Sequence, residues 1–321
     1  MNCAPVLMMG FNRPELSRMV FERVRKARPE KLYFAVDGFR RDKPEEEAIV
    51  KEVQSIVGSV DWPCEVHTRF RDVNLGCAYA IPDAISWMLS SEAYGIILED
   101  DVCPGDGFFA YETELLERYK DDTRIGMVSG FNQCNYQTSK TDSYHFSNRA
   151  DIWGWGTWSR VWKDYSLDVS SYLPKIDEML EGYTSNGRMK KSIRGSVEWV
   201  CRELTTWDIQ FMVMFIAHGY LSAVPRRRMT GNFGFGDVRA VHTTAVSYDS
   251  IYYNDIWDGE SIVHPQFVHP DVRAIDLTER RMCGKMAGAL MWLADIMPRF
   301  RSRIFNAGKV LECIAPALFR I

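Results

Sequence analysis

Short apolar runs alternate with longer amphipathic segments through the first 100 residues, and this alternation restricts the fold more than any other feature of the chain. A short apolar run between turn residues predicts a buried strand, and apolar residues at helical spacing predict a helix. The predicted strands are residues 6–9, 31–36, 64–70 and 95–98, and the predicted helices are residues 14–27, 44–57 and 78–89. Strands that alternate with helices form βαβ units, so we expect an α/β fold with a mainly parallel sheet.

The pattern becomes mixed from residue 124 onward. Residues 153–162 predict a turn rich in tryptophan and glycine that continues into a helix, and residues 198–217 predict one long helix. The remaining predicted segments are strands at residues 125–128 and 220–224 and a glycine-rich loop at residues 231–236.

The composition is that of an ordinary globular protein, with 46% hydrophobic and 26% charged residues and a formal net charge of −4. Without a basic stripe in the main part of the chain, we expect no nucleic-acid partner. The eight cysteines form no C-x-x-C pair and none lies near a histidine at zinc-ligand spacing, which indicates reduced thiols and a cytoplasmic location. No apolar run is long enough to span a bilayer or to form a signal peptide.

Polar residues follow each predicted strand of the first 100 residues. In a parallel sheet the carboxyl ends of the strands meet at one edge, where open α/β sheets bind ligands. The residues at these ends are Phe11-Asn12-Arg13, Asp37-Gly38, Asn74-Leu75-Gly76 and Glu99-Asp100-Asp101. This shared position predicts a binding site.

The acidic run Glu99-Asp100-Asp101 predicts a metal site. Adjacent carboxylates repel one another, and a divalent cation such as Mg²⁺ or Mn²⁺ relieves that repulsion through hard oxygen ligands. Such an ion neutralises negative charge on a leaving diphosphate. The alternative is a solvated acidic turn or an N-cap for the segment that follows Pro104; the strand context favours the metal.

The stretch ILEDDVCPGDGFFAY resembles the metal-binding DXD-type motif of GT-A glycosyltransferases. It is especially similar to the EDD version in N-acetylglucosaminyltransferase I and related bacterial sugar transferases. The resemblance implies a Rossmann-like, three-layer α/β/α nucleotide-sugar-binding fold. It also implies that Asp101 binds Mn²⁺ or Mg²⁺, that Asp100 contacts the nucleotide and that Glu99 contacts the donor sugar.

Three further stretches match the family in order, within a similarity that covers residues 5 to about 245. MGFNRP resembles the stretch whose arginine reaches the diphosphate, here Arg13, and FAVDG resembles the position where an aspartate binds the uracil edge, here Asp37. RDVNLGCAYAI resembles the helix start beside the nucleotide and implicates Asn74 and Gly76. Each has a simpler alternative, because an arginine before a proline, an Asp-Gly pair and an Asn-Leu-Gly turn are also ordinary surface features.

Transfer with inversion requires a general base for the acceptor hydroxyl. Asp208, in Thr206-Trp207-Asp208-Ile209-Gln210, resembles the Trp-Asp element that carries the base in this family. The alternative is a helix cap. The predicted helix at residues 198–204 argues against a cap, so we favour the base.

Two glycine-rich segments complete the predicted site. A WGWGTW segment similar to that at residues 153–158 lines the sugar pocket of the related bacterial enzymes, which implicates Trp155, Gly156 and Thr157; the alternative is core tryptophans. The loop before His242 resembles the closing loop of the family. His242 is then a nucleotide-sugar contact or a second metal ligand, and a structural role for this histidine is equally favoured.

Together these features predict a metal-dependent, inverting glycosyltransferase that moves a hexose or N-acetylhexosamine from a UDP-sugar to a hydroxyl of a glycan or glycolipid. The alternatives are a catalytically inactive sugar-nucleotide or glycan-binding protein and a nucleotidyltransferase. A nucleotidyltransferase is expected to have a glycine-rich phosphate loop after the first strand, and the sequence of residues 10–14 is not glycine-rich.

The chain divides into a main domain at residues 1–270, with a nucleotide-sugar half at 1–123 and an acceptor half at 124–270, and a tail at 271–321. From residue 273 the tail carries nine Lys and Arg against four Asp and Glu, with apolar residues at helical spacing. Such a basic amphipathic helix can lie peripherally on an anionic membrane near a lipid-linked saccharide acceptor. It can equally pack on the main domain or on a second subunit.

Overall fold

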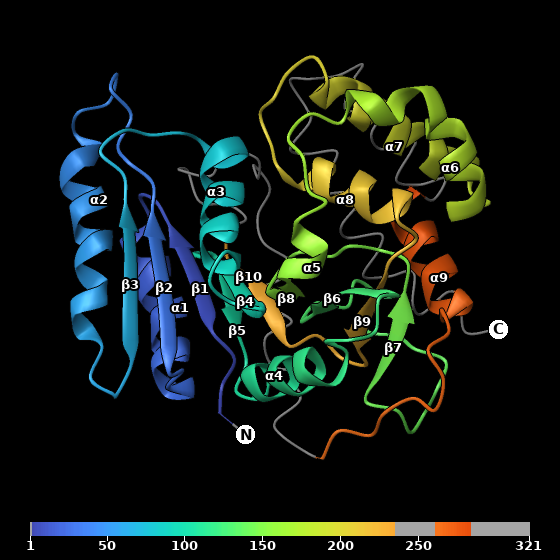
Figure 1. The fold of residues 1–321 in the computed structure, drawn as a ribbon, viewed down its shortest axis with the longest axis horizontal. Coiled ribbons are helices and arrows are strands. Elements are labelled where there is room, and N and C mark those ends of the chain that lie inside the picture. Colours follow the sequence, from blue (N-terminus) through green and yellow to red (C-terminus); the bar gives the residue numbers. More distant parts are fainter. Residues whose placement is uncertain (1, 235–260, 284–321) are drawn as a thin grey trace, which may run out of the picture.

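The computed structural model describes residues 2–234 and 261–283, and Figure 1 shows their arrangement. An eight-stranded, mostly parallel sheet has the order β3-β2-β1-β4-β8-β6-β9-β7, and helices pack against it. The predicted α/β class is therefore confirmed, and the architecture is compatible with a Rossmann-like fold. A separate two-stranded sheet pairs β5 with β10.

The first half of the chain folds as the alternating pattern predicts. The strands are β1 (Val6–Gly10), β2 (Lys31–Val36), β3 (Glu65–Phe70) and β4 (Tyr94–Glu99), and the helices are α1 (Pro14–Ala27), α2 (Glu46–Ser55), η1 (Ile56–Ser59) and α3 (Cys77–Leu89). The bounds of α1 follow from local chemistry, because Pro14 lies in its first turn and Arg25 and Lys26 lie in its last turn. The four strands are parallel to one another.

The strand order reverses between β1 and β4, and this reversal positions the site. The chain builds outward from β1 through β2 to β3 and then crosses to β4 on the other side of β1. Helices α1 and α2 contact each other, whereas α3 contacts β1, β4 and α5. In an open α/β sheet a crevice forms at the carboxyl ends of the strands where the order reverses, here after β1 and β4.

The second half contains β5 (Val102–Pro104), α4 (Phe108–Arg118), β6 (Ile125–Ser129), β7 (Tyr144–Ser147), β8 (Trp155–Trp158), α5 (Ser159–Trp162), β9 (Leu221–Pro225) and β10 (Thr230–Asn232). The predicted strands in this half are confirmed. Of the turn and helix predicted at residues 153–162, the bend at Trp153 and Gly154 and the helix α5 are confirmed, but Trp155–Trp158 is an antiparallel strand between β4 and β6. Gly156 of this strand resembles a turn residue in the sequence, but it is glycine because α4 packs closely against it.

A helical layer covers one end of the sheet in the upper right of Figure 1 and has its own apolar core. It comprises η2 (Ser170–Lys175), α6 (Ile176–Tyr183), α7 (Gly187–Val200) and α8 (Asp208–Ala217). The predicted continuous helix at residues 198–217 is wrong. The chain leaves the helix after Val200 and begins another at Asp208, because Trp207 turns into the main core and lies against Trp155 with ring centroids 6.0 Å apart.

The carboxyl group of Glu112, on α4, is buried against β8, and neither of its oxygens has a hydrogen-bond partner among the described residues. It fills the space above Gly156, where an added Cβ would lie 2.7 Å from Oε2 of Glu112. Burial raises the pKa of Glu112 well above its ordinary value. Burial therefore favours the neutral form of this carboxyl group in the folded protein.

Replacing Glu112 with glutamine is expected to stabilise the protein increasingly as pH rises. The unfolded chain loses the Glu112 proton near the ordinary pKa, while the folded protein retains it, so the wild type loses stability with rising pH. The advantage of Glu112→Gln should grow by about 1.4 kcal/mol per pH unit above pH 5 while Glu112 stays protonated. Urea unfolding at pH 5 to 8 measures it. Glu117→Gln, at a partly exposed position on the same helix, is the control. Parallel stability curves for Glu112→Gln and wild type would contradict the account.

The last described segment contains α9 (Val272–Cys283), which contacts β7 and α7. Glu279 of this helix is buried, and its Oε2 accepts a hydrogen bond of 2.7 Å from Thr184. Within residues 2–234 and 261–283 we find no helix with the length and apolar character that crossing a membrane requires. Most of the predicted tail and His242 lie outside the described residues, and the domain division stays a prediction.

Candidate active site

A cavity of about 580 Å³ lies at the carboxyl ends of the parallel strands. Its walls come from the segments after β1, β2, β3 and β4, the start of α3, the loop before α8 and Asn232 of β10. It brings together most of the residues predicted from the sequence: Arg13, Asp37, Asn74, Gly76, Glu99, Asp100, Asp101 and Asp208.

Arg13 joins the two aspartates that follow β4. Its Nη1 lies 3.0 Å from Oδ2 of Asp101, and its Nη2 forms an ion pair with Oδ1 of Asp100. The Asp100 side chain is 4% exposed, while those of Arg13 and Asp101 are each 16% exposed. β1 and β4 are adjacent in the sheet, so the arginine after one strand reaches the acids after the other.

Negative charge exceeds positive charge at this end of the cavity. Burial, followed by the charges of Asp101 and Asp100, raises the pKa of Glu99 to about 8. Burial also raises the pKa of Asp100 to about 6, although Arg13 acts in the opposite direction. A divalent cation would offset this surplus, and carboxylate oxygens are the ligands that Mg²⁺ and Mn²⁺ prefer.

The residues at this end therefore fit a metal by charge and donor type. In the part of the chain that the structure describes, no three His, Cys, Asp or Glu side chains are already grouped to hold an ion. Arg13 pairs with both aspartates instead. An ion bound at Asp101 would compete with Arg13 for this carboxylate, and a diphosphate is an alternative anion that arginine binds well.

Asp37 closes the loop between β3 and α3. Its Oδ1 accepts hydrogen bonds from the backbone N–H groups of Gly38 at 2.9 Å and Leu75 at 3.0 Å. Its Oδ2 accepts from the side chain of Asn74 at 2.9 Å and the backbone of Gly76 at 3.0 Å. The Asp37 carboxylate therefore stabilises this loop through four hydrogen bonds. This structural role was not predicted from the sequence.

Gly38 is required because the backbone of Val73 approaches it closely. A Cβ at position 38 would lie 2.4 Å from the Val73 backbone, which no side chain tolerates. Asp37 and Gly38 together fix the position of residues 73–76 at the cavity wall. The predicted uracil contact of Asp37 stays a prediction, and it would have to share a carboxylate that already accepts from four groups.

Asp208 is the first residue of α8, and its side chain accepts a hydrogen bond from the hydroxyl of Thr206. It lies at the acidic end, since its charge contributes to the raised pKa of Glu99. Because residues 201–207 are not helical, the argument against a helix-terminal role fails, and an acid in the first turn is favourable for a helix dipole. The role of Asp208 as base stays a prediction.

Trp155, Gly156 and Thr157 do not line this cavity, contrary to expectation. Trp155 is 1% exposed, and Thr157 is fully buried, with its hydroxyl donating to the carbonyl of Gly126 at 2.8 Å. These residues belong to β8 in the middle of the sheet, so their environment is the core. The preceding residues, Ile152 and Trp153, line the cavity in their place.

Three arginines that line this cavity were not predicted from the sequence: Arg40, Arg69 and Arg71. Arg69 and Arg71 share the carboxylate of Asp83, and Arg40 pairs with Glu46. Arg69 is in β3, and the other two follow β2 and β3. The signal that could have found them is the same strand-end position that singled out Asp37 and Asn74.

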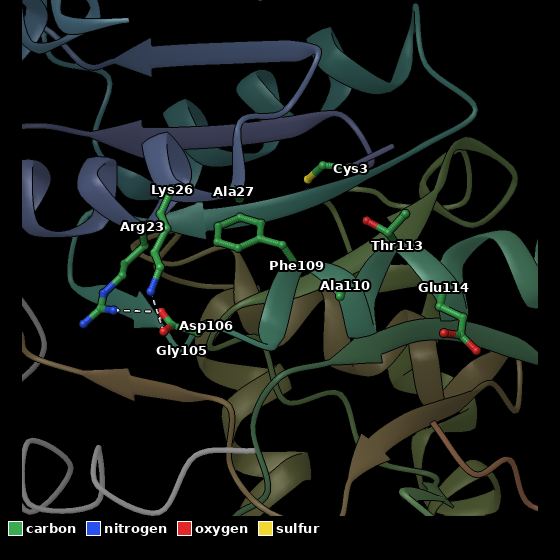
Figure 2. Close-up of a pocket in the computed structure, with 10 residues that line it drawn as sticks. All are labelled: Cys3, Arg23, Lys26, Ala27, Gly105, Asp106, Phe109, Ala110, Thr113 and Glu114. Atoms are coloured by element: carbon green, nitrogen blue, oxygen red, sulfur yellow. Dashed lines mark hydrogen bonds and ion pairs between the residues drawn. The ribbon is translucent and has the colours of Figure 1, made fainter. Parts of the chain in front are cut away.

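A second cavity, of about 400 Å³, lies between α1 and α4 and contains none of the predicted residues. Figure 2 shows Arg23 and Lys26 of α1 directed toward Asp106, with which both form ion pairs. The side chain of Asp106 is 51% exposed, so these pairs are surface interactions. We therefore place the candidate active site in the larger cavity.

Comparison with known proteins does not identify the functional class of this chain. No protein-family model matches the chain, and no curated protein matches its sequence. Among solved structures, HddC from Yersinia pseudotuberculosis is similar, with a TM-score of 0.33 and 13% sequence identity. The match covers 54% of this chain and 86% of that chain. A similarity at this level supports no conclusion about function.

Proposed function

We propose that the chain is a metal-dependent glycosyltransferase with a GT-A fold. It transfers a hexose or N-acetylhexosamine, with inversion, from a UDP-sugar to a hydroxyl of a glycan or glycolipid. The observation that carries this proposal is the group Arg13, Asp100 and Asp101 at the strand reversal, in one cavity with Asp208. The resemblance of residues 97–111 to the DXD-type motif gives the group its chemical interpretation.

In this proposal Asp101 binds Mn²⁺ or Mg²⁺, which supplies positive charge for the leaving diphosphate. Arg13 exchanges the carboxylate of Asp101 for the diphosphate, as a guanidinium does readily. Asp100 holds Arg13 in place beside the nucleotide, and Glu99 contacts the donor sugar. Asp208 takes the proton of the acceptor hydroxyl as that oxygen attacks the anomeric carbon, which is the role of a general base.

Metal-dependent breakdown of a nucleotide-sugar tests the proposal directly. A panel of UDP-, GDP- and ADP-sugars is incubated with the protein and Mn²⁺, and the released products are identified. We expect slow release of UDP from one UDP-sugar, abolished by EDTA and restored by Mn²⁺. Pyrophosphate release from a nucleoside triphosphate and a sugar phosphate would instead identify a nucleotidyltransferase. Thermal stabilisation by the nucleotide-sugar without turnover, even with a panel of acceptor saccharides, would identify a binding protein.

A further inference from the structure

The two edges of the eight-stranded sheet differ in how they are covered. Figure 1 shows β3 and β7 at opposite ends of this sheet. Beside β7, the backbone N–H of Ser143 donates a hydrogen bond of 2.8 Å to the carbonyl of Val263. The backbone N–H of Asp271 likewise donates one of 2.8 Å to the carbonyl of Phe146. The segment that leads into α9 therefore covers the β7 edge.

The β3 edge has no comparable cover in residues 2–234 and 261–283, where β2 is the one strand that pairs with it. The backbone N–H groups of Glu65 and Arg71 donate to carbonyls of the β2 segment, at 2.7 and 3.1 Å. The direction of these groups alternates along a strand, so Val66, Thr68 and Phe70 direct theirs to the outer edge. Such a row of outward groups is a template on which another strand can pair.

The side chains of β3 do not block a second strand. Val66 and Phe70 are 38% and 39% exposed, and Thr68 between them is also exposed. Natural sheets protect their edges with prolines, lysines or bulges. β3 contains neither proline nor lysine, and its register with β2 continues without a bulge over all six residues. A regular edge strand with exposed apolar side chains marks an association surface.

The charges of β3 make the strand complementary to itself. Glu65 begins the strand, and its side chain is 61% exposed. Arg69 and Arg71 lie on the same face of the sheet at the other end and share one carboxylate, that of Asp83. Positive charge is therefore in excess at that end, while His67 lies between, with Nε2 3.0 Å from Glu65. An antiparallel copy of β3 brings opposite charges together, whereas a parallel copy would bring like charges together.

We propose that a second copy of this chain pairs with β3, in the antiparallel direction and about a two-fold axis at Thr68. In this register the outward residues of both strands form hydrogen-bonded pairs, with Val66 opposite Phe70 of the second copy and Thr68 opposite its own equivalent. The two sheets then form one continuous sheet. Because a two-fold contact uses the same surface on both copies, the assembly closes as a dimer. This inference goes beyond the proposed function and does not depend on it.

Sedimentation velocity at a series of protein concentrations tests the proposal. We expect wild type to form a concentration-dependent dimer. Thr68→Lys places two ammonium groups opposite each other at the axis and should raise the dimer dissociation constant at least about tenfold. Thr68→Val should keep the dimer, because valine has nearly the same shape and suits a strand. Thr141→Lys makes the same charge change at another exposed threonine and should sediment as wild type does.

Oxidative cross-linking tests the register and the identity of the occupant. Residues of a hydrogen-bonded antiparallel pair have Cα atoms about 5.5 Å apart, within the range of about 4.4 to 6.8 Å that a disulfide spans. Thr68→Cys should therefore form a disulfide-linked dimer, and Val66→Cys should not exceed wild type, because Val66 faces Phe70 of the second copy.

Three results would overturn the proposal. The first is a wild type that stays monomeric at every concentration. The second is a Thr68→Lys variant that dimerises as tightly as wild type while its thermal unfolding shows that it is folded. The third is cross-linking of Val66→Cys as readily as of Thr68→Cys, which would exclude the proposed register. None of these results bears on the proposed function, which is measured separately by nucleotide-sugar breakdown.

Discussion

Asp101→Asn is expected to lower metal-dependent glycosyl transfer by about a thousandfold. The charge that a bound cation contributes to a leaving diphosphate amounts to several kcal/mol, and about 4 kcal/mol corresponds to a thousandfold change in rate. Asparagine has nearly the same shape as aspartate but no charge. Asp101 is also one of the two carboxylates that pair with Arg13, at 3.0 Å. Steady-state rates at saturating Mn²⁺ and donor measure the loss.

Asp106→Asn provides the comparison for this variant. Asp106 lies five residues further along, is half-exposed and pairs with the surface cations Arg23 and Lys26 in the second cavity. Losing those surface pairs should change stability by less than about 1 kcal/mol and leave transfer unchanged. If Asp101→Asn retained more than about a tenth of wild-type transfer while folded, Asp101 would not be a metal ligand.

Asp208→Asn is expected to reduce transfer by about a hundredfold to ten thousandfold, the contribution of a positioned general base. Binding of Mn²⁺ and UDP should persist, because Asp208 is the first residue of α8 and is not among the residues that follow β4. Separate measurement of donor binding by calorimetry and of transfer by product formation distinguishes a base from a donor contact.

If Asp208 instead stabilises the start of α8, Asp208→Asn should lower stability and leave transfer unchanged, and a second first-turn acid serves as the control. Asp177 occupies the first turn of α6, has a 72% exposed side chain and pairs with Arg194 on the surface, so Asp177→Asn reports the loss of a first-turn charge together with one exposed ion pair. If Asp208→Asn loses stability as Asp177→Asn does and keeps its transfer activity, then Asp208 acts on the helix and not on the acceptor.

The first half of the fold was predictable because its information is local. α1 begins and ends at residues 14 and 27 as predicted, since Pro14 favours the first turn and the apolar positions repeat at helical spacing. The acids of the site were predictable for the same reason. Once residues 95–98 are a strand, Glu99 to Asp101 must lie at its carboxyl end, and the parallel order then brings Arg13 beside them.

The errors concern residues whose roles depend on distant parts of the chain. Gly156 looks like a turn residue, but it lies in a strand, and glycine is needed there because Glu112 of α4 occupies the space above it. The break before Asp208 exists because Trp207 packs on Trp155. Asp37 looks like a ligand for a base, yet it hydrogen-bonds to residues 74–76 of a loop far along the chain. None of these pairings has a local signal.

The most direct test of the account is an anomalous difference map from a crystal grown with Mn²⁺ and UDP. We expect a manganese peak within coordination distance of an Asp101 carboxylate oxygen, with the diphosphate on the ion and Arg13 turned toward a phosphate oxygen. A map with UDP bound in the cavity and no peak beside Asp101, while Arg13 keeps its pairs with Asp100 and Asp101, would contradict the central claim.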